Sequence, residues 1–465
     1  MHLFNYLTRK IEPFDKRKGE EVGLYTCGPT VYDYVHIGNW RTFVFEDILK
    51  RVLVFYGYKV QHVMNITDIE DKIFKKAQEE KVSIEKITKK YEKAFLADLK
   101  KLNIQKADVY PRATGSIDSI ISLVKKLLDK GVAYKKEGSV YFLISKFKNY
   151  GKLSGTNIQG IKVGARVDVD EYDKDNPSDF ALWKKSKNGE VEFDAPFGKG
   201  RPGWHIECSA MSMKYLGESF DIHTGGVDLL FPHHENEIAQ SEVATGKKPF
   251  VRFWLEGEHL LVNGEKMAKS LKNIFTLEDI KKRGFDPLAL RYLFLTAHYR
   301  SKLNFTWKSL EAARNALENL RNVVSGYSSS EEQSDESRSS MLDSSRQART
   351  INEFVEKFRQ AINDDLDMPK ALSVMWKMVK SDYPSSAKNQ SILVVDRVLG
   401  LGLGNLEKTQ LPKGAKELID KREKLRKEGE FEESDKLRKE LLEMGIEVED
   451  TEEGPKWKIK SGSSR

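Results

Sequence analysis

The sequence predicts an α/β protein: a parallel-sheet domain that is split by an insertion and followed by a helical bundle and a small C-terminal domain. Three observations carry this prediction. A strand, a glycine turn, a helix and a second strand follow one another near the start. Short strand-like stretches with many turn residues interrupt the pattern in the middle, and the last third is mainly helical and rich in charge.

The N-terminal unit is the clearest part of the pattern. Glu21–Tyr25 (EVGLY) is a strand candidate that leads into the turn Cys27–Thr30, which contains glycine and proline. Arg41–Phe55 then has apolar residues at helical spacing, and Val60–Ile66 is the next strand candidate. A strand–turn–helix–strand unit of this kind is typical of Rossmann-type nucleotide-binding domains.

The remaining chain divides by composition. Lys75–Asn103 and Ser116–Lys130 have helical spacing, whereas Tyr134–Gly200 is rich in Gly, Lys and Asp and suits short strands and turns. The expected segments are a first half of the Rossmann-type domain (1–115), a connective insertion (116–202), the second half (203–285), a helical region (286–400) with a serine-rich linker (327–346), and a small final domain (405–465).

Composition excludes several classes of protein. The chain has 465 residues, 39% of them hydrophobic, and no apolar run approaches the length that spans a bilayer. The first ten residues, MHLFNYLTRK, lack the apolar core of a secretory signal, so we expect a cytoplasmic protein without a membrane partner. The net charge of +7 permits nucleic-acid binding without demonstrating it. The only two cysteines, Cys27 and Cys208, exclude a disulfide framework.

The tetrapeptide His36-Ile37-Gly38-Asn39 follows the proline turn and opens the first helix. A helix N-terminus presents unpaired N–H groups and a positive dipole end to a phosphate. Gly38 lets a nucleotide approach the backbone because it has no side chain, and His36 can donate a hydrogen bond to a phosphate oxygen. Taken alone, the tetrapeptide also fits a simple helix cap and tight turn.

A second motif, Lys266-Met267-Ala268-Lys269-Ser270, lies much later in the chain. Two lysines three positions apart among small residues form a doubly cationic loop. Such a loop can neutralise the charge that develops on a pyrophosphate leaving group. Taken alone, it also fits a solvated surface loop.

The third constellation combines metal-type ligands. His205-Ile206-Glu207-Cys208 is followed by Asp221–Asp228 and by Phe231–Glu237, and four of the nine histidines fall within this region. His233 and Glu237 are four positions apart on a helix that Pro232 can start, so they share one face. With Cys27 and Cys208 they supply two thiolates, one imidazole and one carboxylate, which suit tetrahedral zinc. The alternative is a polar cluster with capping histidines.

Together, the first two motifs resemble the HIGH and KMSKS motifs of class I aminoacyl-tRNA synthetases. Asn39 stands for the second histidine and Ala268 for the serine, but both lysines remain. The chain is also similar to cysteinyl-tRNA synthetases over nearly its whole length, the serine-rich linker excepted. The matching segments are YTCGPTVYDYVHIGN (25–39), MNITDIEDK (64–72), GWHIECSAMS (203–212), Asp221–Gln240, Lys266–Ser270, DPLALR (286–291) and Gly445–Trp457.

This resemblance implies a cysteine–tRNA ligase and its site. ATP with magnesium would activate L-cysteine to cysteinyl-adenylate and pyrophosphate, and cysteine would then pass to the 2′-hydroxyl of the terminal adenosine of tRNA(Cys). Zinc would separate the thiol of cysteine from the hydroxyl of serine. The implied site residues are Cys27, Cys208, His233 and Glu237 on one zinc ion, Thr67, Trp204 and His223 around cysteine, and His36, Gly38, Asn39, Lys266 and Lys269 on ATP and its phosphates.

The resemblance also implies how tRNA is bound. The helical region would grip the tRNA stem, residues 405–465 would bind the anticodon, and Trp457 would offer a face for stacking a base. We expect a monomer. Two alternatives stay open: an ATP-dependent ligase that joins cysteine to a small amine, and a non-catalytic tRNA-binding relative. The matching segment Gly445–Trp457 favours the tRNA ligase over the first, and intact His36, Lys266 and Lys269 argue against the second.

Overall fold

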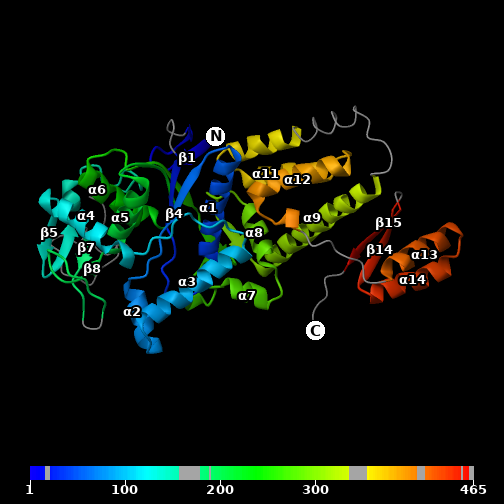
Figure 1. Ribbon diagram of the computed structural model, residues 1–465, viewed down its shortest axis with the longest axis horizontal. Coiled ribbons are helices and arrows are strands. Elements are labelled where there is room, and N and C mark those ends of the chain that lie inside the picture. Colours follow the sequence, from blue (N-terminus) through cyan, green and yellow to red (C-terminus); the bar gives the residue numbers. More distant parts are fainter. Residues whose placement is uncertain are drawn as a thin grey trace.

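The computed structural model describes residues 1–15, 21–156, 179–187, 190–334, 353–405, 414–451 and 454–459. Its centre is a four-stranded sheet with the strand order β10–β9–β3–β4 (Figure 1). The strands are β3 (Val22–Thr26), β4 (Val60–Met64), β9 (Phe220–Gly226) and β10 (Val251–Gly257). All three pairings are parallel. The parallel sheet predicted from the sequence is therefore confirmed.

The order of the strands places a switch point at the carboxyl end of β3. The helix α1 (Ile37–Phe55) connects β3 to β4 on one side. On the other side β3 pairs with β9, which the chain reaches only after the insertion. Ligands of open α/β sheets bind at the carboxyl ends of strands that flank such a point. The residues that follow β3, β4 and β9 are therefore brought together.

The insertion forms a second, antiparallel sheet with the order β5–β6–β7–β8, at the left of Figure 1. Its elements are α4 (Ile117–Asp129), β5 (Ala133–Lys136), β6 (Ser139–Phe142), β7 (Phe180–Lys184) and β8 (Arg201–Pro202). The helices α5 (Trp204–Leu216) and α6 (Glu235–Thr245) return the chain to the central sheet. Phe142 and Leu182 of the insertion share one core with Tyr25 and Trp254 of the central sheet.

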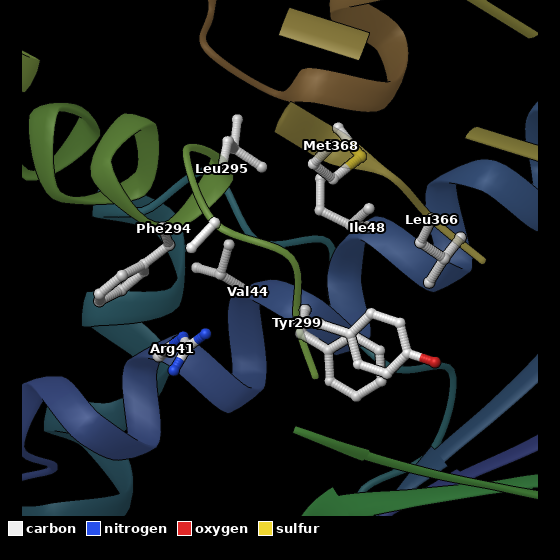
Figure 2. Close-up of a pocket in the computed structure, with 10 residues that line it drawn as sticks. Arg41, Val44, Ile48, Phe294, Leu295, Tyr299, Leu366 and Met368 are labelled. Atoms are coloured by element: carbon white, nitrogen blue, oxygen red, sulfur yellow. The ribbon is translucent and has the colours of Figure 1, made fainter. Parts of the chain in front are cut away.

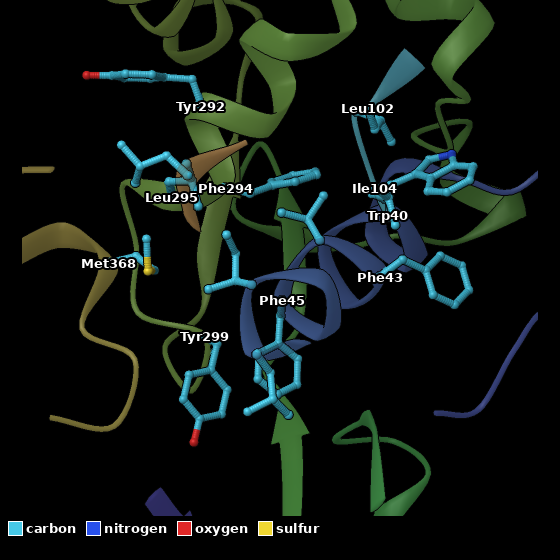
Figure 3. Packing of buried hydrophobic residues seen from close by; sticks show 14 of the residues in the cluster. Trp40, Phe43, Phe45, Leu102, Ile104, Tyr292, Phe294, Leu295, Tyr299 and Met368 are labelled. Carbon is cyan, nitrogen blue, oxygen red and sulfur yellow. The ribbon is translucent and has the colours of Figure 1, made fainter. Parts of the chain in front are cut away.

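A larger core joins α1 to the helical half of the chain. Figure 3 shows Phe45 of α1 beside Tyr299, and their stacked ring centroids are 4.4 Å apart. The elements of this half are β11 (Leu260–Val262), β12 (Glu265–Lys266), α7 (Leu277–Lys282), α8 (Pro287–Leu295), β13 (Leu303–Phe305), α9 (Trp307–Ser334), a helix over 353–363, α11 (Met368–Val379) and α12 (Ser385–Leu399). The predicted helical character of this region is confirmed.

A cavity of about 30 Å³ lies in this core (Figure 2). Its walls are mainly apolar and include Val44, Ile48, Leu366 and Met368. The guanidinium of Arg41 is satisfied by backbone carbonyl oxygens, including that of His259 at 2.7 Å. A space of this size holds about one water molecule, so the cavity is a packing feature rather than a substrate site.

Three shorter segments complete the molecule. The hairpin β1 (His2–Asn5) and β2 (Lys10–Pro13) lies beside β10, and α2 (Asp71–Glu80) and α3 (Ile84–Lys101) form an arm after β4. The tail contains α13 (Ala415–Lys427), α14 (Phe431–Glu443), β14 (Ile446–Thr451) and β15 (Gly454–Ile459). It has a small core of its own, which includes Ile419 and Leu441.

Two parts of the tRNA prediction fall partly outside the described residues. The helix α9 continues to Ser334, so the segment expected as a serine-rich linker begins inside a helix, and the rest of 327–346 lies outside the description. The side chain of Trp457 lies outside it as well. Among the helices that the structure does describe, none has the length and apolar content needed to cross a membrane.

Candidate metal centre and active site

The candidate metal ligands gather beyond the carboxyl end of β3. Cys27 directly follows this strand, Cys208 comes from α5, and Glu237 comes from the first turn of α6. His233 lies in the turn Leu230–His234 that precedes α6. The sequence prediction that Pro232 starts this helix is confirmed, because the extended backbone of Phe231 marks a kink and the helical backbone from Pro232 onward runs directly into α6. The helical spacing of His233 and Glu237 therefore holds, and His234 between them has helical backbone angles.

The four predicted ligands face a common point. One donor atom from each of Cys27, Cys208, His233 and Glu237 lies within 4.8 Å of all the others. His233 Nε2 is 3.8 Å from Cys27 Sγ and 3.1 Å from Glu237 Oε1. Zinc bonds of about 2.0–2.3 Å place tetrahedral ligands roughly 3.3–3.8 Å apart. The cluster can therefore close on a zinc ion with small adjustments.

One buried oxygen of the cluster has a charged neighbour but no aligned hydrogen bond. Glu237 Oε1 is buried and makes no hydrogen bond in the described structure, although His233 Nε2 is only 3.1 Å away. A buried carboxylate oxygen without a partner is costly. A metal ion at the common point would satisfy this oxygen, so the donor set fits zinc.

Two of the proposed ligands, His233 and Glu237, each contact a further histidine through the atom that does not face the metal position. His205 Nδ1 is 2.9 Å from His233 Nδ1, and His223 Nε2 is 3.1 Å from Glu237 Oε2. Such outer contacts orient metal ligands and fix the histidine tautomer. The role of His205 was missed in the sequence, where it appeared only as one more histidine of the cluster.

A second grouping shares two of these ligands. Cys27, His223, His234 and Glu237 also offer donor atoms within 4.8 Å of one another. His234 Nδ1, however, lies 2.7 Å from Glu256 Oε1, and His234 Nε2 lies 3.7 Å from Cys27 Sγ. His234 therefore contacts the Cys27 thiol as a neighbour while Glu256 fixes its ring. The set Cys27, Cys208, His233 and Glu237 is the better zinc site. It supplies two sulfur ligands, and its His233 and Glu237 each have a second partner that orients them. No pattern in the sequence pointed to Glu256.

The charges of the cluster suit a dication. A hydrogen bond from Cys27 lowers the pKa of Cys208 to about 6, and the same bond raises the pKa of Cys27 well above its usual value. Burial alone would lower the pKa of His233, but the Cys208 thiolate and the Glu237 carboxylate raise it to about 10. These shifts favour a Cys208 thiolate and a Glu237 carboxylate, two negative charges against the one of a His233 imidazolium, whose proton a metal would displace.

The residues expected around the substrate surround this cluster. The ring of Trp204 lies 4.4 Å from that of His233, centroid to centroid. His223 contacts the cluster through Glu237, and Thr67 follows β4, where the Asn65 amide donates to its hydroxyl at 3.2 Å. Trp204 and His223 thus contact ligands of the cluster, whereas Thr67 lies just beyond the carboxyl end of β4.

Gly28 permits the turn that carries Cys27. A Cβ atom at this position would lie 1.7 Å from the backbone oxygen of Asn65. The Gly28 N–H also donates to the Asn65 side chain at 2.9 Å. Only glycine allows the turn after β3 to approach the end of β4 this closely.

His36 caps α1 as the sequence predicted. Its Nδ1 accepts a hydrogen bond from the Asn39 N–H at 3.3 Å. Burial lowers the pKa of His36, so the ring is neutral near pH 7. A neutral ring that accepts at Nδ1 carries its proton on Nε2. His36 can therefore donate to a phosphate at the helix N-terminus.

The structure brings the two nucleotide motifs together. Ile37 N–H donates to the Phe275 carbonyl at 2.8 Å. A Cβ on Gly38 would lie 2.1 Å from Met267 Cε, so the Met267 methyl group occupies the space that the sequence left for a nucleotide. Lys266 and Lys269 are exposed, and neither amine has an ion-pair partner within the described ranges. The Asn273 side chain holds the backbone between them, accepting from Ala268 N–H at 2.8 Å.

Comparisons with known proteins agree with this geometry. Residues 13–315 match the family described as tRNA synthetases class I (C) catalytic domain, and residues 408–457 match the cysteinyl-tRNA ligase anticodon binding domain. The cysteine–tRNA ligase of Chlamydia muridarum is 46% identical, with 98% of this chain and 99% of that protein covered. The cysteine–tRNA ligase of Brachyspira hyodysenteriae is 44% identical over the same shares.

A solved structure supports the fold. Methionyl-tRNA synthetase of Mycobacterium tuberculosis in complex with methionyl-adenylate has a TM-score of 0.60, with 14% identity, over 83% of this chain and 92% of that one. The full-length relatives and the two matched domains assign this chain to a family: it belongs to the cysteine–tRNA ligases, which are class I aminoacyl-tRNA synthetases.

Proposed function

We propose that this protein joins L-cysteine to tRNA(Cys) in two steps. Cysteine carboxylate attacks the α-phosphate of ATP, which gives cysteinyl-adenylate and pyrophosphate. The 2′-hydroxyl of the terminal adenosine of tRNA then takes the cysteinyl group, and AMP leaves. The observation that carries this proposal is the cluster of two thiols, an imidazole and a carboxylate directly after β3, together with the contact between the two nucleotide motifs at the start of α1.

The four ligands proposed for zinc are Cys27, Cys208, His233 and Glu237. Zinc bound there would supply a soft acceptor that favours a thiol ligand over a hydroxyl. The chain's own residues would position the amino acid beside it. Trp204, which packs against His233, would cover the pocket, while Thr67 and His223 would hold cysteine through polar atoms.

The phosphates of ATP, with magnesium, are proposed to bind between the two motifs. His36 would donate from Nε2, and the Asn39 side chain in the first turn of α1 would lie beside the same anion, while the Asn39 N–H holds His36 Nδ1 in place. Lys266 and Lys269 would stabilise charge on the departing pyrophosphate. Because Met267 now lies against Gly38, the loop must shift when ATP binds there.

The test separates the two steps. Cysteine-dependent ATP–pyrophosphate exchange is measured without tRNA, and charging of tRNA(Cys) is measured next. We expect both activities, with serine activated very poorly. Exchange without charging of tRNA would favour the ligase of cysteine to a small amine, and loss of both would favour the non-catalytic relative. The anticodon-domain match over 408–457 supports the tRNA substrate.

A further inference from the structure

Tyr34 presents an aromatic face to solvent beside the ATP motif. Its side chain is 50% exposed, and it lies two residues before His36, the cap of α1. The ring is held edge-on by Tyr91 of α3, with centroids 5.1 Å apart and an interplanar angle of 86°. Because the ring is already fixed in orientation, it loses little conformational entropy when a flat partner stacks on its exposed face.

The arm that holds Tyr34 is strongly basic. Residues 71–101, which span α2 and α3, contain ten lysines and six acidic residues, a net charge of +4 in a chain whose total is +7. Figure 1 shows this arm extending from the central sheet. More than half of the net positive charge is therefore concentrated in one short segment beside the active site.

Lysines of the arm lie beside the rings that neighbour Tyr34. Lys90 Nζ lies 4.7 Å from the ring centroid of Tyr91, and Lys72 Nζ lies 5.7 Å from that of Tyr32. Lys76 and Lys90 share the carboxylate of Glu80, at 3.5 and 3.6 Å. Asp33 also interacts with Lys76, so the excess positive charge here belongs to the arm as a whole, with its net charge of +4, rather than to the Glu80 pairs.

We propose that Tyr34, Lys72, Lys76 and Lys90 form a docking surface, here called the Tyr34 surface, for the single-stranded 3′ end of tRNA. An unpaired base would stack on Tyr34, and the lysines would contact the flanking phosphates. An exposed ring among cations is the combination that binds single-stranded nucleic acid. This inference rests on the proposed function, because the terminal adenosine must reach the crevice next to His36, and Tyr34 adjoins that entrance along the chain.

The experiment uses the full-length protein with zinc, ATP, cysteine and transcribed tRNA(Cys). The variants are Tyr34→Ala, Tyr34→Phe and the double change Lys76→Ala, Lys90→Ala. Lys89→Ala is the matched control, since its amine lies on the same helix but pairs with Glu85 at 2.6 Å. Cysteine-dependent pyrophosphate exchange and charging are measured for each, together with the melting temperature.

Tyr34→Ala should raise KM for tRNA about fivefold or more, and exchange should change less than twofold, because the variant can no longer stack a base. Tyr34→Phe keeps the ring and should stay near wild type. The double lysine variant should bind tRNA more weakly. Its binding should also depend less on salt: the slope of log K against log salt concentration should become shallower by about 0.7 for each phosphate contact that is lost. Lys89→Ala should match wild type.

Two results would overturn the inference. Unchanged KM for tRNA in Tyr34→Ala and in the double lysine variant would show that the surface does not meet tRNA. A rise in KM for ATP during exchange would instead place Tyr34 in the nucleotide pocket. If wild-type protein performs exchange and charging while these variants match it, the Tyr34 surface fails and the proposed function stands.

Discussion

The guanidinium of Arg291 lies 2.6 Å from the carboxylate of Asp47, and both side chains are inaccessible to solvent. Arg291 also donates to the backbone carbonyl of Leu399 at 2.7 Å. Asp47 belongs to α1, Arg291 to α8, and Leu399 ends α12. One buried ion pair thus ties the helix that carries the ATP motif to the helical bundle.

Asp47→Asn should lower the stability by about 3–5 kcal/mol, because Arg291 and Arg51 would keep their charges in the core without a counterion. The urea midpoint followed by tryptophan fluorescence checks this. Glu85→Gln, which removes the exposed partner of Lys89, is the control and should change stability by less than about 1 kcal/mol. Equal midpoints for both variants would refute the role of the buried pair.

Purified protein should contain one zinc ion per chain, and the double variant Cys27→Ala, Cys208→Ala should lose it. Both sulfur ligands of the proposed set are then absent, and a thiolate contributes strongly to zinc affinity. Atomic emission analysis of metal per chain is the measurement. Stoichiometric zinc in the double variant would reject the ligand set.

His205→Ala should weaken zinc binding about 10- to 100-fold, because His205 holds His233 from behind at 2.9 Å. Competition with a chromogenic chelator measures the affinity. The exposed His2 provides the control variant His2→Ala, which should bind zinc as wild type does. An unchanged affinity in His205→Ala would mean that the contact does not orient the ligand.

Lys269→Ala should lower the rate of pyrophosphate exchange by about 10²–10³, with little change in KM for cysteine, since Lys269 is expected to meet charge that grows in the transition state. Steady-state exchange kinetics separate the two parameters. Lys282→Ala removes an equally exposed lysine at the end of α7 and serves as the control. Exchange at the wild-type rate in Lys269→Ala would exclude the loop from catalysis.

Deletion of the residues after Gly404 should leave cysteine-dependent exchange largely intact and strongly reduce charging of tRNA. The tail packs around a core of its own, so its removal exposes little of the catalytic core. The two assays are compared on the same preparations, with circular dichroism as a check of folding. Charging at the full-length rate would contradict an anticodon role for this domain.

Glu46→Gln should remove a pH dependence of stability. Burial raises the pKa of Glu46 from 4.5 to about 8, and Thr224 donates to it at 2.9 Å. Between these two values the unfolded chain loses a proton that the folded chain keeps, so wild-type stability falls as pH rises, by at most about 1.4 kcal/mol per pH unit. The variant should match wild type near pH 4.5 and be more stable at pH 8, as judged by urea midpoints. Parallel curves would show that Glu46 is ionised in the fold.

The local elements and the types of chemistry could be read from the sequence. Apolar spacing over Arg41–Phe55 and the tetrapeptide at His36 predicted α1, and the helix does begin at Ile37 with His36 as its cap. The scarcity of cysteine also made Cys27 and Cys208 stand out, and the helical spacing of His233 and Glu237 predicted their shared face. These features depend on bonds between residues that are near in the chain, so local patterns are enough to predict them.

Which distant groups meet depends on the tertiary structure. The strand order places β9 beside β3, and this pairing brings His223 to Glu237 and encloses Glu46 against Thr224. The contact of Met267 with the Gly38 backbone and the pairing of Asp47 with Arg291 likewise join residues far apart in the chain. Linear order does not encode strand order or helix packing, because these are settled by how all the apolar faces are buried together.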